Sequence, residues 1–390
     1  MMRKSMLVLV LALSLALALV GLTGCRSKDP VVVTPPVATV EDAPEPEPTE
    51  PILWPLTGLE AESEEDILAR PLSVKFDNHP SVTMQLNVNH ADVVIETLAE
   101  GGVTRFNGIF QSDIPEEVMP VRSARDSDLI IVPQYGDALF FYSGANQSVL
   151  RAIREAGLAS MSHSAIGGEL YRRAQGRAPH NLAVNLARAY EVAEQRGFDI
   201  VTEEPIKGFD FRELGYQADD AVTTTEANDN GTASNAATND VDTNGAETNG
   251  TEAEGVSEPT GPRPASSVGI NFSAHANNTW DWDSENEVWT RTSSGRIQYS
   301  GEDEQITTNN LVVIWADHSR GSIAGTYAID MAGEGNASIF MDGKRIDGTW
   351  EGFTDRPPVF KDESGAEILL IPGRTWMSVM QPGENINSSE

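Results

Sequence analysis

Cysteine is almost absent from this 390-residue chain, because Cys25 is the only one. A single thiol excludes an intramolecular disulfide and a thiolate metal cluster. Basic residues are also few: 27 Lys and Arg stand against 59 Asp and Glu, which gives a formal net charge of -32. A chain of this charge repels the phosphate backbone of nucleic acids, so we expect no nucleic-acid partner.

Long hydrophobic runs are missing as well, except near the N-terminus. Arg3 and Lys4 precede an apolar run from Met6 to Val20, which leads into Leu22-Thr23-Gly24-Cys25. The run is too short for a comfortable membrane span and stands where the core of a signal peptide is found. Small residues directly before a lone cysteine resemble the lipobox of bacterial lipoproteins.

The lipobox resemblance implies that residues 1–24 are a signal peptide and that Cys25 carries a lipid. Two acyl chains on one residue are enough for stable anchoring. We therefore expect an extracytoplasmic protein that is lipid-anchored to the cell membrane of a bacterium. The alternative is a signal peptide that is followed by an incidental cysteine.

Two further segments lack positive charge: the first combines proline with like charge, and the second has almost no large apolar residue. Asp29 to Asp66 contains eleven carboxylates, Asp219 to Glu258 contains ten, and neither stretch contains Lys or Arg. Proline with like charge keeps the first segment extended and solvated, and the second segment cannot bury a core. We predict a Pro/Glu-rich tether at 25–54 and a disordered acidic linker at 218–265.

The tether and the linker delimit two predicted domains, at 55–217 and 266–382, with a tail at 383–390. In the first domain the pattern predicts strands at 72–76, 92–98, 104–111 and 137–142 and helices at 146–156 and 185–196. The second domain has no ten-residue helical pattern. Its short β-rich runs lie at 280–282, 288–290, 311–315, 337–340, 368–371 and 376–379, between turn-forming residues. The expected fold class is α+β: an α/β layered domain, then a mostly β sandwich or barrel-like domain.

Ordered motifs in both domains resemble one known family. The first domain contains Phe76-Asp77-Asn78-His79-Pro80, Ala91-Asp92-Val93-Val94, Glu100-Gly101-Gly102-Val103-Thr104-Arg105-Phe106, Pro120-Val121-Arg122-Ser123-Ala124-Arg125 and Ala178-Pro179-His180-Asn181-Leu182. The second contains Trp289-Thr290-Arg291, Asn309-Asn310-Leu311-Val312-Val313, Gly348-Thr349-Trp350 and Pro372-Gly373-Arg374-Thr375-Trp376. In this order they resemble the YerB-type family of bacterial lipoproteins. The resemblance implies a two-domain envelope lipoprotein and no known reaction.

Polar residues of these motifs are candidates for ligand binding. Guanidinium groups suit bidentate binding of carboxylate or phosphate, so we expect an anionic envelope ligand or partner, such as a cell-wall polymer or an envelope protein. The alternative is an internal ion-pair network that joins these arginines to Asp77, Asp92 or Asp126. The candidate residues are Asp77, Asn78, His79, Arg105, Arg122, Ser123, Arg125, His180 and Asn181.

An enzymatic function remains a second hypothesis. A cell-wall-active hydrolase or transferase would use His180 or His79 as base, Ser123 or Ser143 as nucleophile and Asp77 to orient the base. No Gly-x-Ser-x-Gly motif supports this arrangement. A third hypothesis is a purely structural lipoprotein whose arginines are locked in internal pairs.

Metal and cofactor motifs are lacking. The six histidines are scattered without a His-x-x-x-His pair, and the acidic run Asp281 to Glu287 lacks the glycine that a calcium loop needs. We expect neither a metal site nor a cofactor. Six of the seven tryptophans lie in the second predicted domain, where we favour core packing over stacking on sugars.

Overall fold

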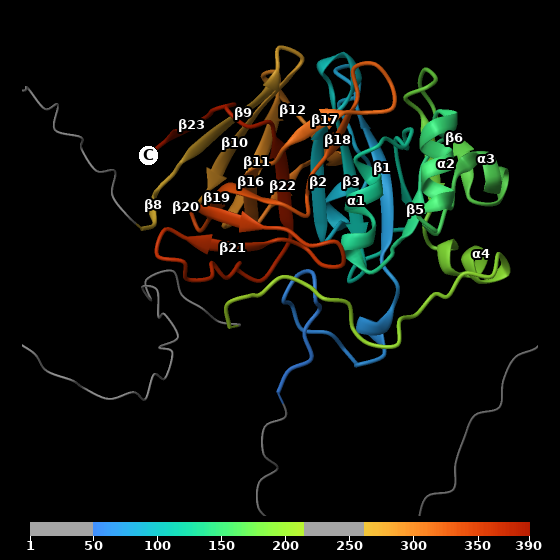
Figure 1. Cartoon of the computed structure of the whole chain (residues 1–390), viewed down its shortest axis with the longest axis horizontal. Coiled ribbons are helices and arrows are strands. Elements are labelled where there is room, and N and C mark those ends of the chain that lie inside the picture. Colours follow the sequence, from blue (N-terminus) through green and yellow to red (C-terminus); the bar gives the residue numbers. More distant parts are fainter. Residues whose placement is uncertain (1–49, 214–260) are drawn as a thin grey trace, which may run out of the picture. The chain divides into compact units, whose positions relative to one another are not determined.

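The computed structural model describes residues 50–213 and 261–390 (Figure 1). The predicted signal peptide, Cys25 and most of the predicted tether and linker lie outside the described residues. Within the described ranges, no helix is both long and apolar enough to cross a membrane.

A mixed ten-stranded sheet contains strands from both sequence regions. Its order is β21-β20-β19-β16-β22-β2-β3-β1-β5, and β8 also pairs with β20. The strands from the first region are β1 (Leu72–Asn78), β2 (Val93–Leu98), β3 (Thr104–Phe110) and β5 (Leu139–Phe141). Those from the second are β8 (Arg263–Pro264), β16 (Asn310–Trp315), β19 (Glu334–Met341), β20 (Lys344–Glu351), β21 (Val359–Asp362) and β22 (Thr375–Met380).

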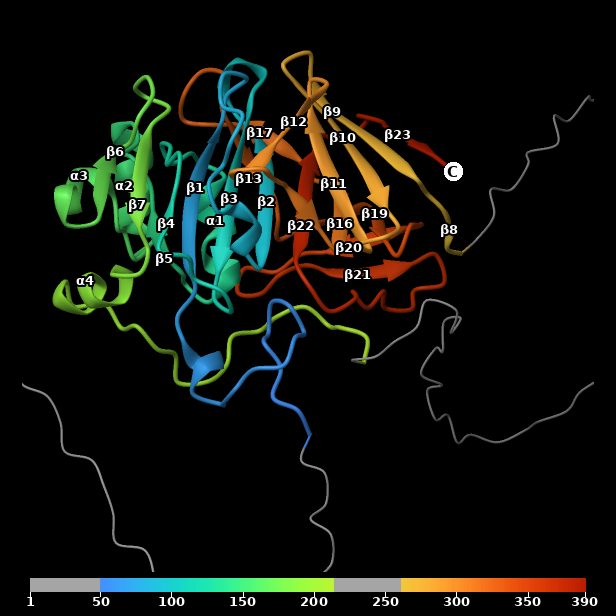
Figure 2. The ribbon, with the colours of Figure 1, turned by 180° about the vertical axis from the view of Figure 1, so that it is seen from behind.

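The two regions meet at the parallel pair β2–β22, where Val93 is opposite Thr375. Figure 2 shows β1, β3, β2 and β22 side by side from the reverse direction. All residues of these central strands are buried, and they include charged side chains such as Lys75, Asp77 and Glu96 among the apolar ones. The fold is α+β as predicted, with an α/β first region and a mostly β second region. Local patterns did not show that both regions share this sheet.

Successive side chains of the central strands enter two different hydrophobic cores, as the two-residue period of a strand requires. Val93 and Ile95 belong to one core, and Val94 belongs to the other. A third core forms around Phe140 and helix α2 (Gln147–Glu155), which Figure 1 shows beside β5.

A second sheet has the order β12-β11-β10-β9-β23, and β15 also pairs with β11. Alternate residues of β9 are buried, so one face of this sheet covers a core. Trp280, Trp289, Trp350 and Trp376 are at most 1% exposed, which confirms packing as their role. The strands are β9 (Ser267–Ser273), β10 (Ala276–Asp283), β11 (Val288–Ser293), β12 (Arg296–Ile297), β15 (Thr307–Thr308) and β23 (Ile386–Ser389).

The remaining elements are short. Three small sheets contain β4 (Glu117–Val118), β6 (Tyr171–Arg173) and β7 (Leu182–Asn185); β13 (Tyr299–Gly301) and β14 (Glu304–Gln305); and β17 (His318–Arg320) and β18 (Tyr327–Ile329). The other helices are α1 (Asp128–Ile131), α3 (His163–Ile166) and α4 (Ala189–Gln195). Single 3-10 turns are η1 (Asp66–Leu68), η2 (Val88–His90), η3 (Glu100–Gly102), η4 (Pro133–Tyr135) and η5 (Gly167–Glu169).

Of the two helices predicted from the sequence, the first matches the structure and the second begins later than predicted. α2 begins after Asn146, whose side chain accepts the Val149 N–H, and ends before Gly157, whose φ is +71°. α4 begins only at Ala189, later than the predicted start at 185, because Asn185 is the last residue of β7.

Three predicted boundaries differ from the structure. The run 368–371 is no strand, because Leu370 makes only an isolated bridge to Phe211. β8 lies inside the range predicted as linker and pairs with β20. β23 lies inside the predicted tail and pairs with β9. These boundaries depend on strand pairing with distant segments, which cannot be predicted from local composition.

Candidate functional site

Three separate chain segments converge at the C-terminal end of β1. The Asp77 N–H donates to Pro120 O at 2.9 Å, and the Arg122 N–H donates to Lys75 O at 2.7 Å. On the other side of the 120–122 segment, the Val121 N–H donates to Leu182 O at 2.7 Å. These backbone bonds place the β6–β7 loop, which carries His180, beside β1.

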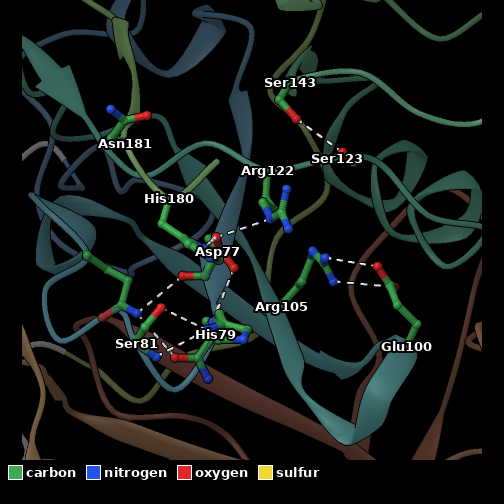
Figure 3. Close-up of polar contacts among 12 residues, drawn as sticks. Asp77, His79, Ser81, Glu100, Arg105, Arg122, Ser123, Ser143, His180 and Asn181 are labelled. Atoms are coloured by element: carbon green, nitrogen blue, oxygen red, sulfur yellow. Dashed lines mark hydrogen bonds and ion pairs between the residues drawn. The ribbon is translucent and has the colours of Figure 1, made fainter. Parts of the chain in front are cut away.

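Asp77 is the centre of this arrangement (Figure 3). Its Oδ2 lies 2.6 Å from Nδ1 of His180 and 3.1 Å from Nε of Arg122. Its Oδ1 accepts the backbone N–H of His79 at 3.1 Å. The Asp77 side chain is 2% exposed, whereas the side chains of Arg122 and His180 are 23% and 22% exposed. One covered carboxylate therefore holds two basic groups whose outer edges reach solvent.

The contact with Asp77 fixes the orientation of the His180 ring. An ionised carboxylate only accepts hydrogen bonds, so Nδ1 of His180 carries the proton in this pair. Nε2 is then the atom that is left for a ligand. It accepts a hydrogen bond in the neutral ring and donates one in the protonated ring.

His79 packs against His180, with ring centroids 4.7 Å apart and planes 31° apart. The Ser81 N–H donates to Nδ1 of His79 at 3.2 Å, so this nitrogen is an acceptor. Partial burial lowers the pKa of His79, and the nearby His180 lowers it further. The neutral ring is therefore the favoured form of His79 in the absence of an anion.

Arg105 and Arg125 are engaged by one carboxylate, Glu100, at η3. Nη2 of Arg105 lies 3.1 Å from Glu100 Oε1, and Nε of Arg125 lies 2.7 Å from Glu100 Oε2. Burial acts to raise the pKa of Glu100, but the Arg125 hydrogen bond and both guanidinium charges lower it to about 2. Burial, aided by the charge of Arg125, lowers the pKa of Arg105 to about 10. These two arginines are thus held in an internal cluster.

Ser123 is oriented toward another serine. Its Oγ lies 3.2 Å from Oγ of Ser143, apart from the His180 ring in Figure 3. Within the described ranges, the hydroxyl of Ser123 has no hydrogen bond to a histidine. The predicted contact between Asp77 and His180 is present, and in the described part of the chain neither candidate serine, Ser123 or Ser143, has its hydroxyl hydrogen-bonded to this pair.

Asn78 and Asn181 stabilise the backbone and side chains around the site. Nδ2 of Asn78 donates to Thr104 Oγ1 at 2.7 Å, and its Oδ1 accepts from Gln298 Nε2 at 2.9 Å. Nδ2 of Asn181 donates to the carbonyls of Ala174 and Gly176, at 3.0 Å each. Asn78 thereby joins β1 to the second region, and Asn181 fixes the loop that carries His180.

The internal network proposed from the sequence is formed with partly different partners. Arg122 pairs with Asp77 as that alternative predicts. Asp92 instead accepts the Gln111 and Ser112 N–H groups, and Asp126 accepts the Ser322 N–H. Glu100, the partner of the other two arginines, was not among the predicted residues. No group of three metal-ligating side chains occurs in the described part of the chain.

Sequence reasoning also missed a fully buried ion pair next to the site. Nη2 of Arg291 lies 2.9 Å from Glu96 Oε1, and both side chains are 0% exposed. The guanidinium lies within 5.3 Å of the ring centroids of Phe106, Trp280 and Trp376. The signal in the sequence was Glu96, a charged residue within the β-rich run 92–98.

Comparisons with known proteins match both regions of the chain. Residues 56–199 match the N-terminal domain, and residues 268–377 the C-terminal domain, of the family described as "Protein of unknown function (DUF3048)". The chain is 28% identical to "Putative lipoprotein YerB" of Bacillus subtilis (strain 168), over 92% of this chain and 91% of that protein. A crystal structure of YerB from Bacillus subtilis superposes with a TM-score of 0.68 at 24% identity, and covers 87% of this chain and 100% of that one.

Proposed function

Because the chain belongs to the YerB-type lipoprotein family with the two DUF3048 domains in order, we propose that it is a lipid-anchored extracytoplasmic protein that binds an anionic envelope ligand at Asp77, Arg122 and His180. Cys25 is the proposed lipid attachment site. The ligand chemistry that we favour is that of an anionic cell-wall polymer.

The observation that carries this proposal is the pair of partly exposed basic groups on one covered carboxylate. Asp77 fixes both side chains before a ligand arrives, so little side-chain entropy is lost on binding. Arg122 supplies a permanent charge. His180 presents Nε2 as the ring atom that is left for the ligand.

The surroundings of His180 add positive potential. From Leu170 to Tyr190 the sequence contains no Asp or Glu. Arg173 and Arg177 in this stretch are exposed, and neither is ion-paired to a carboxylate within the described ranges. In a chain with a net charge of -32, such a segment attracts an anion locally and disfavours cationic ligands.

The Asp77–His180 pair supports a second candidate, a cell-wall-active hydrolase or transferase in which His180 takes a proton. The 2.6 Å contact gives the base its orientation. Ser123 faces Ser143, so this candidate requires a nucleophile other than the Ser123 hydroxyl in its described position. The binding function needs only contacts that are already formed.

The test uses the full chain in detergent and isolated cell-wall sacculi, with and without their anionic polymers. We expect retention by intact sacculi, weaker retention by stripped ones, and at least a fivefold loss for Arg122→Gln or His180→Asn. Arg151→Gln, which removes an exposed guanidinium on α2, is the matched control. Equal retention of all four proteins contradicts the proposal. Release of soluble fragments that depends on His180 favours the enzyme.

A further inference from the structure

A cavity of about 160 Å³ lies between the loop after β1 and the β11–β12 hairpin. The first region lines it with Asn78, His79, Pro80, Val82 and Thr83. The second region lines it with His275, Ser293, Ser294, Arg296, Ile297 and Gln298. His79 therefore belongs both to the Asp77 site and to a cavity that neither region forms alone.

The ionisable residues that line this cavity are all basic: His79, His275 and Arg296. All three are exposed, and no Asp or Glu lines the cavity. Within the described ranges, no carboxylate pairs with Arg296, so its five N–H donors are available. Hydroxyl groups of Thr83, Ser293 and Ser294 lie on the same walls.

The β11–β12 hairpin holds Arg296 in a defined position. Ser293 pairs with Arg296 and Thr292 pairs with Ile297, which leaves Ser294-Gly295 as a two-residue turn. The φ angles of Ser294 and Gly295 are +49° and +70°, as a type I′ turn requires. The turn directs the chain back along β11 and sets the backbone that carries Arg296.

The floor of the cavity is rigid because its amides are already paired. Nε2 of Gln298 donates to Asn78 Oδ1 at 2.9 Å, and Gln298 Oε1 accepts from Nε of the buried Arg291 at 2.5 Å. These bonds tie the floor to the Glu96–Arg291 pair. The groups left for a ligand are consequently those of the basic walls.

We propose that this cavity binds a phosphate group, as a monoester or diester, between Arg296, His275 and His79. A phosphate presents acceptor oxygens in several directions, which suits donors that come from three different chain segments. A carboxylate presents only two oxygens in one plane. The inference rests on the proposed function and deepens it, because it names the anionic group and adds residues of the second region.

Charge regulation of His79 agrees with this assignment. Asp77 favours its protonated form, whereas burial and the charges of His180, Arg122 and Arg105 disfavour it. A bound phosphate adds negative charge and raises the pKa of His79. Binding of a phosphodiester, whose charge does not change near neutral pH, therefore strengthens as the pH falls through the range in which His79 gains its proton.

The experiment titrates the full chain in detergent with inorganic phosphate, glycerol phosphate and a glycerol phosphodiester, and follows its labelled histidine side chains by NMR. His79→Asn and His275→Asn identify the signals. We expect phosphate compounds to shift both signals, acetate to shift them far less, and Arg296→Gln to weaken phosphate binding at least tenfold. Arg151→Gln, the matched loss of an exposed guanidinium, should bind phosphate as the parent does.

Absence of phosphate-dependent shifts at His79 and His275, or unchanged affinity in Arg296→Gln, overturns the inference. If the protein shows no phosphate-dependent shifts but its retention by sacculi still requires Arg122, the proposed function is supported and the cavity inference is not. If phosphate shifts the histidine signals but retention by sacculi does not depend on Arg122, the cavity inference is supported and the proposed function is not. If phosphatidylglycerol nanodiscs shift the His79 signal and phosphatidylcholine nanodiscs do not, the phosphate source is a lipid headgroup. If only the soluble diester shifts the signal, the source is of the cell-wall type.

Discussion

Nδ1 of His180 lies 2.6 Å from Oδ2 of Asp77, and the two residues are 103 positions apart in the chain. Arg122 reaches the same oxygen at 3.1 Å. The covered carboxylate thus sets the direction of two basic side chains. Its removal affects stability and binding together, whereas removal of either basic group affects mainly binding.

Asp77→Asn tests the structural part of this relationship. The amide keeps the shape but loses the charge that both basic groups contact, so we expect the free energy of unfolding to fall by about 1.5–3 kcal/mol. Denaturant unfolding measures this change. Asp113→Asn is the matched control, because Asp113 is 64% exposed and pairs with His90 at the surface at 2.7 Å. Its expected loss is below about 0.5 kcal/mol, and equal losses in the two variants contradict the account.

Glu100→Gln tests the arginine cluster through pH. The pKa of Glu100 is lowered to about 2 in the folded chain, so its stabilising effect is complete above its ordinary pKa and disappears as the pH falls toward 2. We expect the parent to be more stable than Glu100→Gln at pH 6. The difference in their unfolding free energies should shrink between about pH 4.5 and pH 2. A pH-independent difference would rule out the charge pairing as its cause.

Ser123→Ala distinguishes the proposed binding function from a hydrolase or transferase with Ser123 as its nucleophile. The Ser123 hydroxyl contacts Ser143 Oγ at 3.2 Å, so its removal should leave wall retention within twofold of the parent. Unfolding free energy should change by less than about 0.5 kcal/mol, as for a half-buried hydroxyl with a neutral partner. The check is sacculus retention beside fragment release. If the parent releases soluble fragments and Ser123→Ala does not, Ser123 acts as a nucleophile and the enzyme hypothesis is supported.

Arg291→Met tests the ion pair that joins the two regions. It leaves Glu96 buried without its charge partner, so we expect a loss of about 3–5 kcal/mol in unfolding free energy. The double variant Glu96→Gln/Arg291→Met removes the unpaired charge and should recover part of that loss. Denaturant unfolding of both variants and of Glu96→Gln completes a double-mutant cycle. Strictly additive losses would show that the two charges do not stabilise each other.

Local patterns predicted the elements whose neighbours in sequence determine them. Alternation at 72–76 and the β-rich runs at 92–98 and 104–111 predicted β1, β2 and β3, and the helical pattern at 146–156 predicted α2. The pairing of β2 with β22 was not predictable, because alternation fixes which face a side chain occupies but not which distant strand lies alongside. The strands β8 and β23 were assigned to linker and tail for the same reason.

The candidate site was predictable as a set of residues but not as a set of contacts. The motifs already named Asp77, His79, Arg122 and His180, which the structure brings together. Glu100 was not predicted as the partner of Arg105 and Arg125, because the conformation of η3 determines where the Glu100 carboxylate lies. Whether Ser123 contacts a histidine depends on the direction of its side chain, and a sequence motif does not show that direction.

The central claim is that Arg122 and His180 on Asp77 bind an anionic envelope polymer. The most direct measurement is the dissociation constant of a soluble poly(glycerol phosphate) for the full chain, its Arg122→Gln and His180→Asn variants, and the Arg151→Gln control, at fixed salt and pH. We predict at least a tenfold weaker constant for each site variant and a change within twofold for the control. Equal affinity of Arg122→Gln, His180→Asn and Arg151→Gln would contradict the account.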